Sequence, residues 1–394
     1  MVSLAIQGPA LVLFCGGVGG SEIEEAFGEA LRACASDTLA EALGTEAFEA
    51  VVLVVDEASA RANWQTGKRA KSNGVEVILD VDVPGEAFHF GRRLSDVVRR
   101  YGLNRPVYVG SGLPLIKGDE LAAVASTLRG TERVVVSNNF FSADLVGFVP
   151  GAVVDEVELP DNDRILPRLL FEKAGLENRA LPRTYANQFD IDTPGDLALM
   201  AYAGGAGPNL QRYIDGAGID VERLRRASRL FTDRDAEVLV AGRVGTQTWQ
   251  YLEAETACRV RMFSEERGMQ AAGREKGAAR SLLAYHLQQV GFARFFEELA
   301  SMCQAAFIDT RPIFAHMGLE PSQPDRFRSD AMTPEGIEDA WVREFTAVAC
   351  EAPVPVILGG ASLVAAGVQL LSEAAWREED ERGGGYKPRG RAMT

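Results

Sequence analysis

The 394-residue sequence contains little cysteine and histidine and has no excess of positive charge, and each shortage excludes a class of site. Its five cysteines are widely spaced and form no Cys-x-x-Cys pair, so neither a disulfide framework nor a zinc site is indicated. The formal net charge of −15 argues against a nucleic-acid partner, because such proteins need a basic surface. A small anionic ligand held by local backbone N–H groups is still compatible with this charge.

Long apolar runs and a secretion signal are also missing. No stretch reaches the ~18 consecutive apolar residues that mark a membrane-spanning helix. Residues 1–14 are apolar, but they lack a basic n-region and a small-residue cleavage site. We therefore expect a cytoplasmic protein with no membrane partner. The oligomeric state is open, with a homo-oligomer as one option.

Short apolar runs alternate with helical patterns along most of the chain, which predicts an α/β protein. The length exceeds one ordinary core and indicates two domains. We predict an N-terminal domain with a mostly parallel sheet over residues 1–203. A glycine-rich break then opens a linker and helix over 204–231. A smaller Rossmann-like α/β domain is expected over 232–376, followed by a disordered tail over 377–394.

A glycine-rich turn follows the first apolar run, residues 10–15, and contains Gly16, Gly17, Gly19 and Gly20. Ser21 and Glu24 have the spacing of a capping box, so a helix is expected to begin there. Strand, glycine loop and helix N-terminus together form a geometry that cradles phosphate on backbone N–H groups. A tight turn without a ligand explains the same glycines equally well. We interpret Cys15, at the end of the run, as a buried packing residue rather than a nucleophile.

Two further turns complete the pattern in the first half. The run 105–110 reads as a buried strand and stops at Ser111 and Gly112. Ligands of open parallel sheets bind beyond the carboxyl ends of strands, so this turn is a candidate binding position. The later stretch Phe189-Asp190-Ile191-Asp192-Thr193-Pro194 places Asp190 and Asp192 one residue apart before a predicted helix.

Together the three stretches resemble the nucleotidyltransferases of the GT-A-like α/β class over roughly residues 8–202. The closest likeness is to the molybdenum-cofactor nucleotidyltransferase and phospholactate guanylyltransferase groups. It is carried by Cys15-Gly16-Gly17, by Leu113-Pro114-Leu115 and by Asp190-Ile191-Asp192-Thr193-Pro194. The resemblance implies an NTP bound at Gly16, Gly17, Gly19, Gly20, Ser111 and Gly112. It also implies Mg²⁺ held by the catalytic pair Asp190 and Asp192, and a small phosphorylated or acidic metabolite as acceptor.

The chain departs from that family at three places. Loop 16–20 carries no Arg or Lys, Glu29 stands where the family has a lysine, and Gly112 replaces a metal-binding aspartate. Other side chains can supply the missing groups only if the fold brings them near. The carboxylate candidates are Asp56 and Asp144, and the basic candidates are Lys68, Arg69, Lys71, His89, Arg92 and Arg93. A regulatory protein that binds a nucleotide or phosphometabolite without catalysis is therefore the alternative hypothesis.

The second half matches no family known to us and also has polar residues after its apolar runs. In a parallel sheet these residues share one edge, where they form either a pocket for a phosphorylated or carboxylated ligand or a set of salt bridges. They are Arg243, Glu265, Glu266, Arg267, Asp309, Arg311 and Ser362. His316 is the better candidate for acid–base chemistry in this half, and His286 is interpreted as a core or interface histidine. A third hypothesis places the chemistry of the whole protein here.

Overall fold

A computed structural model describes residues 6–16, 19–61, 64, 74–83, 85–269, 272–275 and 277–383, and the backbone of 69–72. These residues form two compact units that interleave along the chain. The first unit comprises Met1–Gly19, Gly28–Asp190 and Ala206–Tyr213. The second unit comprises Gly20–Phe27, Ile191–Gly205 and Ile214–Thr394.

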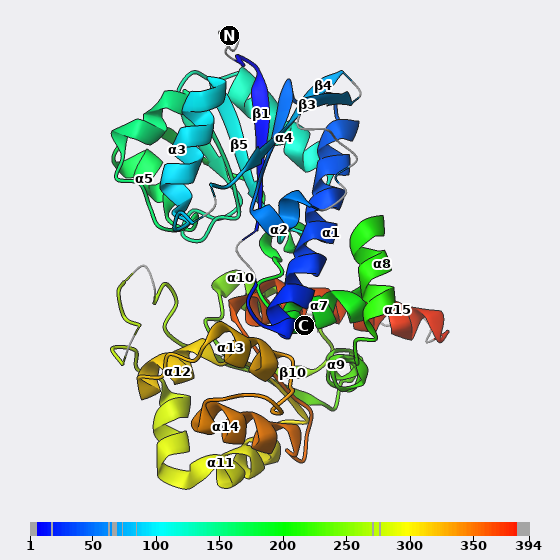
Figure 1. Ribbon diagram of the computed structural model, residues 1–394. Helices are drawn as coiled ribbons and strands as arrows, with labels where there is room; N and C mark the ends of the chain where they lie inside the picture. Colours follow the sequence, from blue (N-terminus) through cyan, green and yellow to red (C-terminus); the bar gives the residue numbers. More distant parts are fainter. Residues whose placement is uncertain are drawn as a thin grey trace. The chain divides into compact units, whose positions relative to one another are not determined.

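The first unit is built on an eight-stranded sheet, of which β1, β3, β4 and β5 are labelled in Figure 1. The strand order is β3-β4-β2-β1-β5-β7-β6-β8. The pairs β2–β4, β1–β2, β1–β5 and β6–β8 are parallel, and β3–β4, β5–β7 and β6–β7 are antiparallel. The strands are β1 (Pro9–Cys15), β2 (Ala50–Val55), β3 (Arg69–Ser72), β4 (Val75–Val81), β5 (Arg105–Gly110), β6 (Val134–Ser137), β7 (Leu145–Val149) and β8 (Glu177–Ala180).

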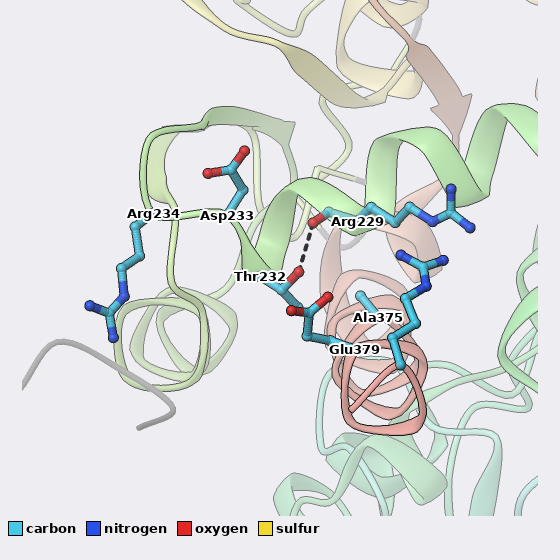
Figure 2. Close-up of a pocket in the computed structure, with 7 residues that line it drawn as sticks. Arg229, Thr232, Asp233, Arg234, Ala375 and Glu379 are labelled. Atoms are coloured by element: carbon cyan, nitrogen blue, oxygen red, sulfur yellow. Dashed lines mark hydrogen bonds between the residues drawn. The ribbon is translucent and has the colours of Figure 1, made fainter. Parts of the chain in front are cut away.

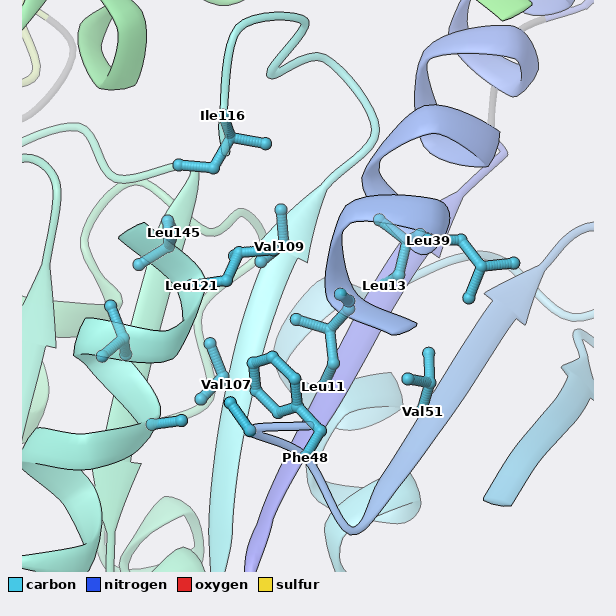
Figure 3. Close-up of a cluster of buried hydrophobic side chains, with 14 of the residues drawn as sticks. Leu11, Leu13, Leu39, Phe48, Val51, Val107, Val109, Ile116, Leu121 and Leu145 are labelled. Carbon is cyan, nitrogen blue, oxygen red and sulfur yellow. The ribbon is translucent and has the colours of Figure 1, made fainter. Parts of the chain in front are cut away.

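Apolar layers cover both faces of this sheet. Successive strand residues point to opposite faces, so a continuously apolar strand is buried on both sides. Leu11 packs in one cluster with Leu39 and Leu121 (Figure 3), and Val12 packs in the opposite cluster with Leu94. The helices and turns with residues in this unit are α1 (Glu22–Gly44), α2 (Glu57–Ala60), α3 (Phe90–Tyr101), α4 (Gly118–Arg129), η1 (Gly151–Glu156), α5 (Leu166–Glu172), α6 (Tyr185–Gln188) and α8 (Pro208–Ala217).

The direction of winding reverses between β1 and β5. From β1 the chain adds β2 and then β4 on one side, whereas β5 lies on the other side of β1. Ligands of open α/β sheets bind at such a switch point, beyond the carboxyl ends of the strands. In this unit the position lies beyond Cys15 and Gly110, which end β1 and β5.

The second unit contains a four-stranded sheet in the order β10-β9-β11-β12, and all of its pairs are parallel. Its switch point lies between β9 and β11. The strands are β9 (Glu237–Gly242), β10 (Arg259–Ser264), β11 (Ala305–Asp309) and β12 (Val356–Gly359). The helices and turns are α7 (Pro194–Ala203), α9 (Glu222–Ser228), η2 (Arg229–Thr232), α10 (Thr246–Glu255), α11 (Leu282–Met302), α12 (Arg311–Met317), α13 (Gln323–Asp330), α14 (Ala340–Cys350), η3 (Leu363–Gly367) and α15 (Val368–Glu381).

The predicted fold class is confirmed, because a large, mostly parallel sheet and a smaller parallel sheet are both present. The two units are nevertheless not separated by a single boundary near residue 203, because residues 20–27 belong to the second unit and residues 206–213 to the first. The linker and helix expected over 204–231 are instead shared between the units and contain α8 and α9. Helix α15 continues to Glu381, five residues into the predicted tail, and residues from 384 onward lie outside the described ones.

Two local predictions also differ from the structure. Residues 321–330 form a polar stretch that the sequence pattern predicts as a loop, but they contain α13, because Ser322 caps the helix by accepting from the Asp325 N–H. Residues 69–72 follow a stretch that the sequence pattern predicts as a helix reaching residue 72, but they form the edge strand β3. In the described ranges, no helix is both long and apolar enough to span a membrane.

Candidate functional site

The carboxyl edge of the first sheet brings several predicted residues to the ends of β1 and β5. Gly16 directly follows β1, and a Cβ at this position would lie 2.9 Å from Cγ of Asp56, which follows β2. Glycine is therefore required where the backbone passes that carboxylate. Ser111 and Gly112 follow β5, and the next residues, Leu113 to Ile116, are buried. Gly17 lies outside the described residues, Gly19 belongs to the first unit and Gly20 to the second.

Cys15, the last residue of β1, is a packing residue, as predicted. It is buried, and burial raises the pKa of its thiol to about 12, well away from a reactive thiolate. Arg32 of α1 lowers this pKa electrostatically, and the Ser111 side chain also lowers it. Ser111, which follows β5, thus lies beside the end of β1. Arg32 supplies a positive charge near the glycine corner at Gly16. Arg32 was not among the predicted site residues, although it stands three residues after Glu29.

An aromatic cluster surrounds the end of β1 on the other face. The ring of Phe14 makes edge contacts with Phe88, Phe90 and Tyr108 at centroid distances of 6.3, 5.7 and 5.3 Å. Phe88 remains 59% exposed, whereas the other three rings are buried. His89 caps α3 by accepting from the Arg92 N–H, and its Nε2 lies 3.0 Å from Asp161 Oδ1. The exposed ring next to the glycine corner was not predicted. The sequence feature that could have indicated it is an aromatic residue, Phe88, directly before the helix N-cap His89.

Carboxylates gather near the end of β5. The Gly110 N–H donates to the Asp144 carbonyl at 2.9 Å, and the Tyr108 hydroxyl donates to Asp163 Oδ2 at 2.6 Å. Burial raises the pKa of Tyr108 well above its usual value, and the charges of Asp163 and Asp144 raise it further. Asp144 was a predicted candidate and Asp163 was not. Asp56, the other strand-end candidate, caps α2 by accepting from the Ser59 N–H at 2.7 Å.

Asp190 belongs to the first unit, whereas Asp192 belongs to the second. Asp192 is exposed, and its N–H donates to the carboxylate of buried Asp196. Asp196 also accepts from the N–H and the hydroxyl of Thr193, which closes the capping box of α7. Burial is the main reason that the pKa of Asp196 lies well above its usual value, and the negative charges of Asp192 and Asp330 also raise it. Among the described residues no group of three or more His, Cys, Asp or Glu could hold a metal ion.

The basic candidates of the first unit divide into engaged and exposed groups. Arg93 donates to Asp82 at 2.7 Å and to the side chain of Asp80 at 2.9 Å, so it stabilises the packing of α3 against β4. Arg92, one residue earlier, is exposed in the first turn of α3. Lys68 lies outside the described residues, and only the backbone of Arg69 and Lys71 is described.

At the switch point of the second sheet, the predicted arginines form ion pairs with aspartates. Arg243 grips Asp309 through Nε at 2.6 Å and Nη2 at 3.1 Å. Arg311 grips Asp330 through Nη1 at 3.0 Å and Nη2 at 2.5 Å. The carboxylates of Asp309 and Asp330 are fully buried, so both arginine forks have charge partners already. The sequence left two alternatives open for these residues, a ligand pocket and a set of salt bridges. The contacts of Arg243 and Arg311 correspond to salt bridges.

The remaining candidates of the second half cap helices or lie apart from these pairs. Glu265 accepts from the Ser281 hydroxyl and the Leu282 N–H, both at 2.7 Å, at the start of α11. His316 Nδ1 accepts from the Ser281 N–H at 3.0 Å, and burial lowers the pKa of His316. Glu266 pairs with Arg274, exposed Arg267 lies near Gly245, and Ser362 precedes η3. His286 is half-exposed and pairs with Glu298 at 2.7 Å, so it is not a core residue.

Comparison with known proteins gives structural neighbours only. No protein-family model and no curated protein sequence matches this chain. A nucleotide-diphospho-sugar transferase described as putative, from Desulfovibrio desulfuricans, is similar at 16% identity and a TM-score of 0.40, covering 54% of this chain and 99% of that one. A cytidylyltransferase from Leptospira borgpetersenii is similar at 16% identity and a TM-score of 0.37, covering 54% and 92%.

A 4-diphosphocytidyl-2C-methyl-D-erythritol synthase from Anaerococcus prevotii is similar at 11% identity and a TM-score of 0.35, covering 48% of this chain and 94% of that one. Each of these neighbours matches about half of this chain.

Proposed function

We propose that the first unit binds a nucleoside triphosphate at the carboxyl edge of its sheet. On this proposal the protein transfers the nucleotidyl group to a small phosphorylated or acidic metabolite. The observation that carries the proposal is the switch point between β1 and β5, where the glycine corner at Gly16 meets Ser111 and Gly112. Backbone N–H groups in such a corner can bind phosphate oxygens without a Cβ in the way.

Positive charge is needed beside the triphosphate, because Asp56 and Asp144 stand close to the corner. Arg32 on α1 and Arg92 in the first turn of α3 are cations of the first unit that can meet this need. Mg²⁺ would supply further charge neutralisation of the triphosphate and the leaving pyrophosphate. The carboxylates of Asp190 and Asp192 suit Mg²⁺, which is commonly bound by one or two carboxylates together with substrate phosphates. Their joint role as metal ligands and catalytic residues stays a prediction.

The aromatic cluster supports a nucleoside as the ligand. Phe88 keeps more than half of its surface exposed although it contacts Phe14 at the end of β1. An exposed aromatic ring beside a phosphate-binding corner offers a face on which a base can stack, and such stacking does not depend strongly on base identity. The identity of the base is therefore left to experiment.

A regulatory protein that binds the nucleotide without transferring it is the second candidate. It is favoured by Gly112, which has no carboxylate at the predicted metal position, and by exposed Glu29 in place of a cation. Binding without transfer needs the glycine corner but not the metal carboxylates. The two candidates therefore differ in what they require of Asp190 and Asp192.

The test is thermal unfolding of the full chain with each common nucleoside triphosphate, with and without Mg²⁺. A ligand at 100 times its Kd adds about 2.7 kcal/mol of stability, which is visible as a rise in Tm. We expect such a rise with at least one triphosphate and Mg²⁺, and a smaller rise without the metal. Asp190→Asn and Asp192→Asn should lose the Mg²⁺-dependent part, whereas Asp235→Asn, at an exposed position of the second unit, should keep it.

Transfer is tested by release of pyrophosphate with candidate acceptors. A triphosphate that raises the Tm without any pyrophosphate release, in wild type and in both aspartate variants alike, supports the regulatory candidate. Absence of a Tm rise with every triphosphate, with or without Mg²⁺, contradicts nucleotide binding altogether.

A further inference from the structure

The turn between β9 and α10 ends in a helix N-terminus that no side chain caps. Gly245 is the N-cap of α10, and the first turn of this helix contains no acidic residue. The N–H groups of Thr246 and Thr248 have no acceptor among the described residues. The turn stands at the carboxyl end of β9, beside the switch point of the second sheet, where open α/β sheets bind their ligands. Unpaired N–H groups and the helix dipole favour a negative charge at such a position.

Arg267 is an exposed cation beside this N-terminus. A Cβ on Gly245 would lie 3.7 Å from Nη2 and 3.8 Å from Cζ of Arg267, so the guanidinium group lies against the N-cap. Arg243 and Arg311 are held by buried aspartates, whereas Arg267 has no hydrogen-bond or ion-pair partner in the part of the chain that the structure describes. Its donors and those of the helix can therefore meet one ligand.

The neighbouring carboxylates are already held by other groups. They are Asp309, Glu265 and Glu266, which bind Arg243, the start of α11 and Arg274. Within the described ranges, the charge of Arg267 is therefore not neutralised by a carboxylate. In a chain whose net charge is −15, an unneutralised arginine at a helix N-terminus is a local feature that favours an anion.

Thr248, in the first turn of α10, adds an independent observation. The residue is only 3% exposed, and its hydroxyl has no hydrogen-bond partner among the described residues. Helical side chains tilt toward the N-terminus of their helix, and a side chain at this third helical position can reach back to the N-cap. Buried hydroxyls in native proteins nearly always have a partner. A ligand oxygen at the N-cap provides one for Thr248.

The arginines before β9 differ from Arg267. Figure 2 shows a surface cavity in which the side chains of Arg229 and Arg234 extend away from each other. Asp233 lines the same cavity, and Arg229 pairs with Glu378 at 3.2 Å. Because these arginines diverge and have carboxylates close by, they do not provide a second site of the same kind.

We propose that the N-terminus of α10, together with Arg267 and Thr248, binds the phosphate group of a small phosphorylated molecule. The donors are backbone N–H groups, a guanidinium group and a hydroxyl group, and a phosphate dianion offers enough acceptor oxygens for all three. Every residue of this site belongs to the second unit, so the proposal does not depend on nucleotide binding by the first.

Isothermal titration of the full chain with inorganic phosphate, glycerol 3-phosphate and glycerol tests the proposal at pH 8 and constant ionic strength. We expect saturable binding of both phosphates and none of glycerol. Arg267→Gln should weaken binding by roughly tenfold or more, because it removes the charged donor. Thr248→Val keeps the shape of the side chain without the hydroxyl and should weaken binding severalfold. Arg234→Gln, at an exposed position before β9, is the matched control and should leave Kd unchanged.

Gly245→Asp separates loss of the site from loss of the fold. Its carboxylate caps the helix N–H groups and competes with phosphate, so binding should be lost while the Tm is kept or raised. The added Cβ would meet Arg267 at 3.7 Å or more, an ordinary contact. Misfolding cannot remove binding at an unchanged Tm, which keeps the proposal testable if another variant unfolds.

Three results overturn the proposal. Equal Kd values in wild type, Arg267→Gln and Gly245→Asp mean that phosphate binds elsewhere on the chain. Equal weakening in Arg234→Gln means that the arginine at this N-terminus has no special role. Absence of phosphate binding at millimolar concentration means that the N-terminus of α10 is not a phosphate site.

Discussion

Gly242, the last residue of β9, shows how tightly single positions are constrained at the switch point of the second sheet. Its φ is +119°, and a Cβ there would lie 2.4 Å from Cβ of Asp309. The close approach lets the Arg243 N–H reach Asp309 Oδ2 at 3.1 Å, next to the guanidinium pair. A side chain would force the two strands or the buried carboxylate to move.

Gly242→Ala should therefore destabilise the protein by about 2 kcal/mol or more, through strain and the clash with Asp309. Gly218→Ala is the matched control, because Gly218 also has a positive φ, +62°, but a Cβ there would meet no atom within 4 Å. That change should cost about 1 kcal/mol, from the left-handed conformation alone. Urea unfolding measures both, and equal losses would show that the contact with Asp309 does not matter.

Helix α8 depends on a residue far from it in sequence. Asp37 of α1 accepts from the Asn209 N–H at 2.9 Å, from Asn209 Nδ2 at 2.8 Å and from the Leu210 N–H at 2.9 Å. The carboxylate thus caps α8, and a Cβ on Gly207 would collide with it at 2.4 Å from Cγ. This contact explains why residues 206–213 belong to the first unit although residues on both sides belong to the second.

Asp37→Ala should cost about 1–2 kcal/mol, as is usual for the loss of a helix cap. It should also speed hydrogen exchange at the Leu210 amide, because its acceptor is gone. Glu25→Ala, an exposed acidic position on the same helix, is the control and should change neither quantity much. Unchanged exchange at Leu210 in Asp37→Ala would mean that α8 is held by its apolar contacts alone.

The interleaving of the two units limits where the whole chain can be divided. Helix α7 precedes the predicted boundary near residue 203, yet it packs against α15 and α13 of the second unit. It buries Leu199 and Met200, and Arg377 donates to the Ala203 carbonyl. A fragment that begins at residue 204 loses these contacts.

We expect a fragment of residues 191–394 to be more stable than one of residues 204–394, by about 5 kcal/mol. The estimate follows from the cost of removing two buried apolar side chains from a packed core. Thermal unfolding followed by circular dichroism compares the two fragments. A shorter fragment with the same Tm would show that α7 contributes nothing to the second unit.

The sequence predicted the strands that contain apolar runs and missed the two outer strands of the first sheet, β3 and β8, which contain none. Residues 10–15 and 105–110 are apolar and bounded by turn residues, and they form β1 and β5. Strand β8, Glu177-Asn178-Arg179-Ala180, is exposed at every position and has no apolar pattern, so only its pairing with β6 makes it a strand. Gly291 lies between two helical patterns in the sequence, and in the structure it kinks α11 at that position with a φ of 77°.

The chain's own sequence determined its α/β class, the strands of both sheets that lie in the core, and the turns at Gly16 and Ser111. These features depend on local periodicity and on residues adjacent in the chain. The tertiary structure alone decided that Arg243 and Arg311 pair with buried aspartates and that Arg32 lies near Cys15. Such contacts join residues far apart in sequence, and local pattern carries no record of which distant side chain will be the partner.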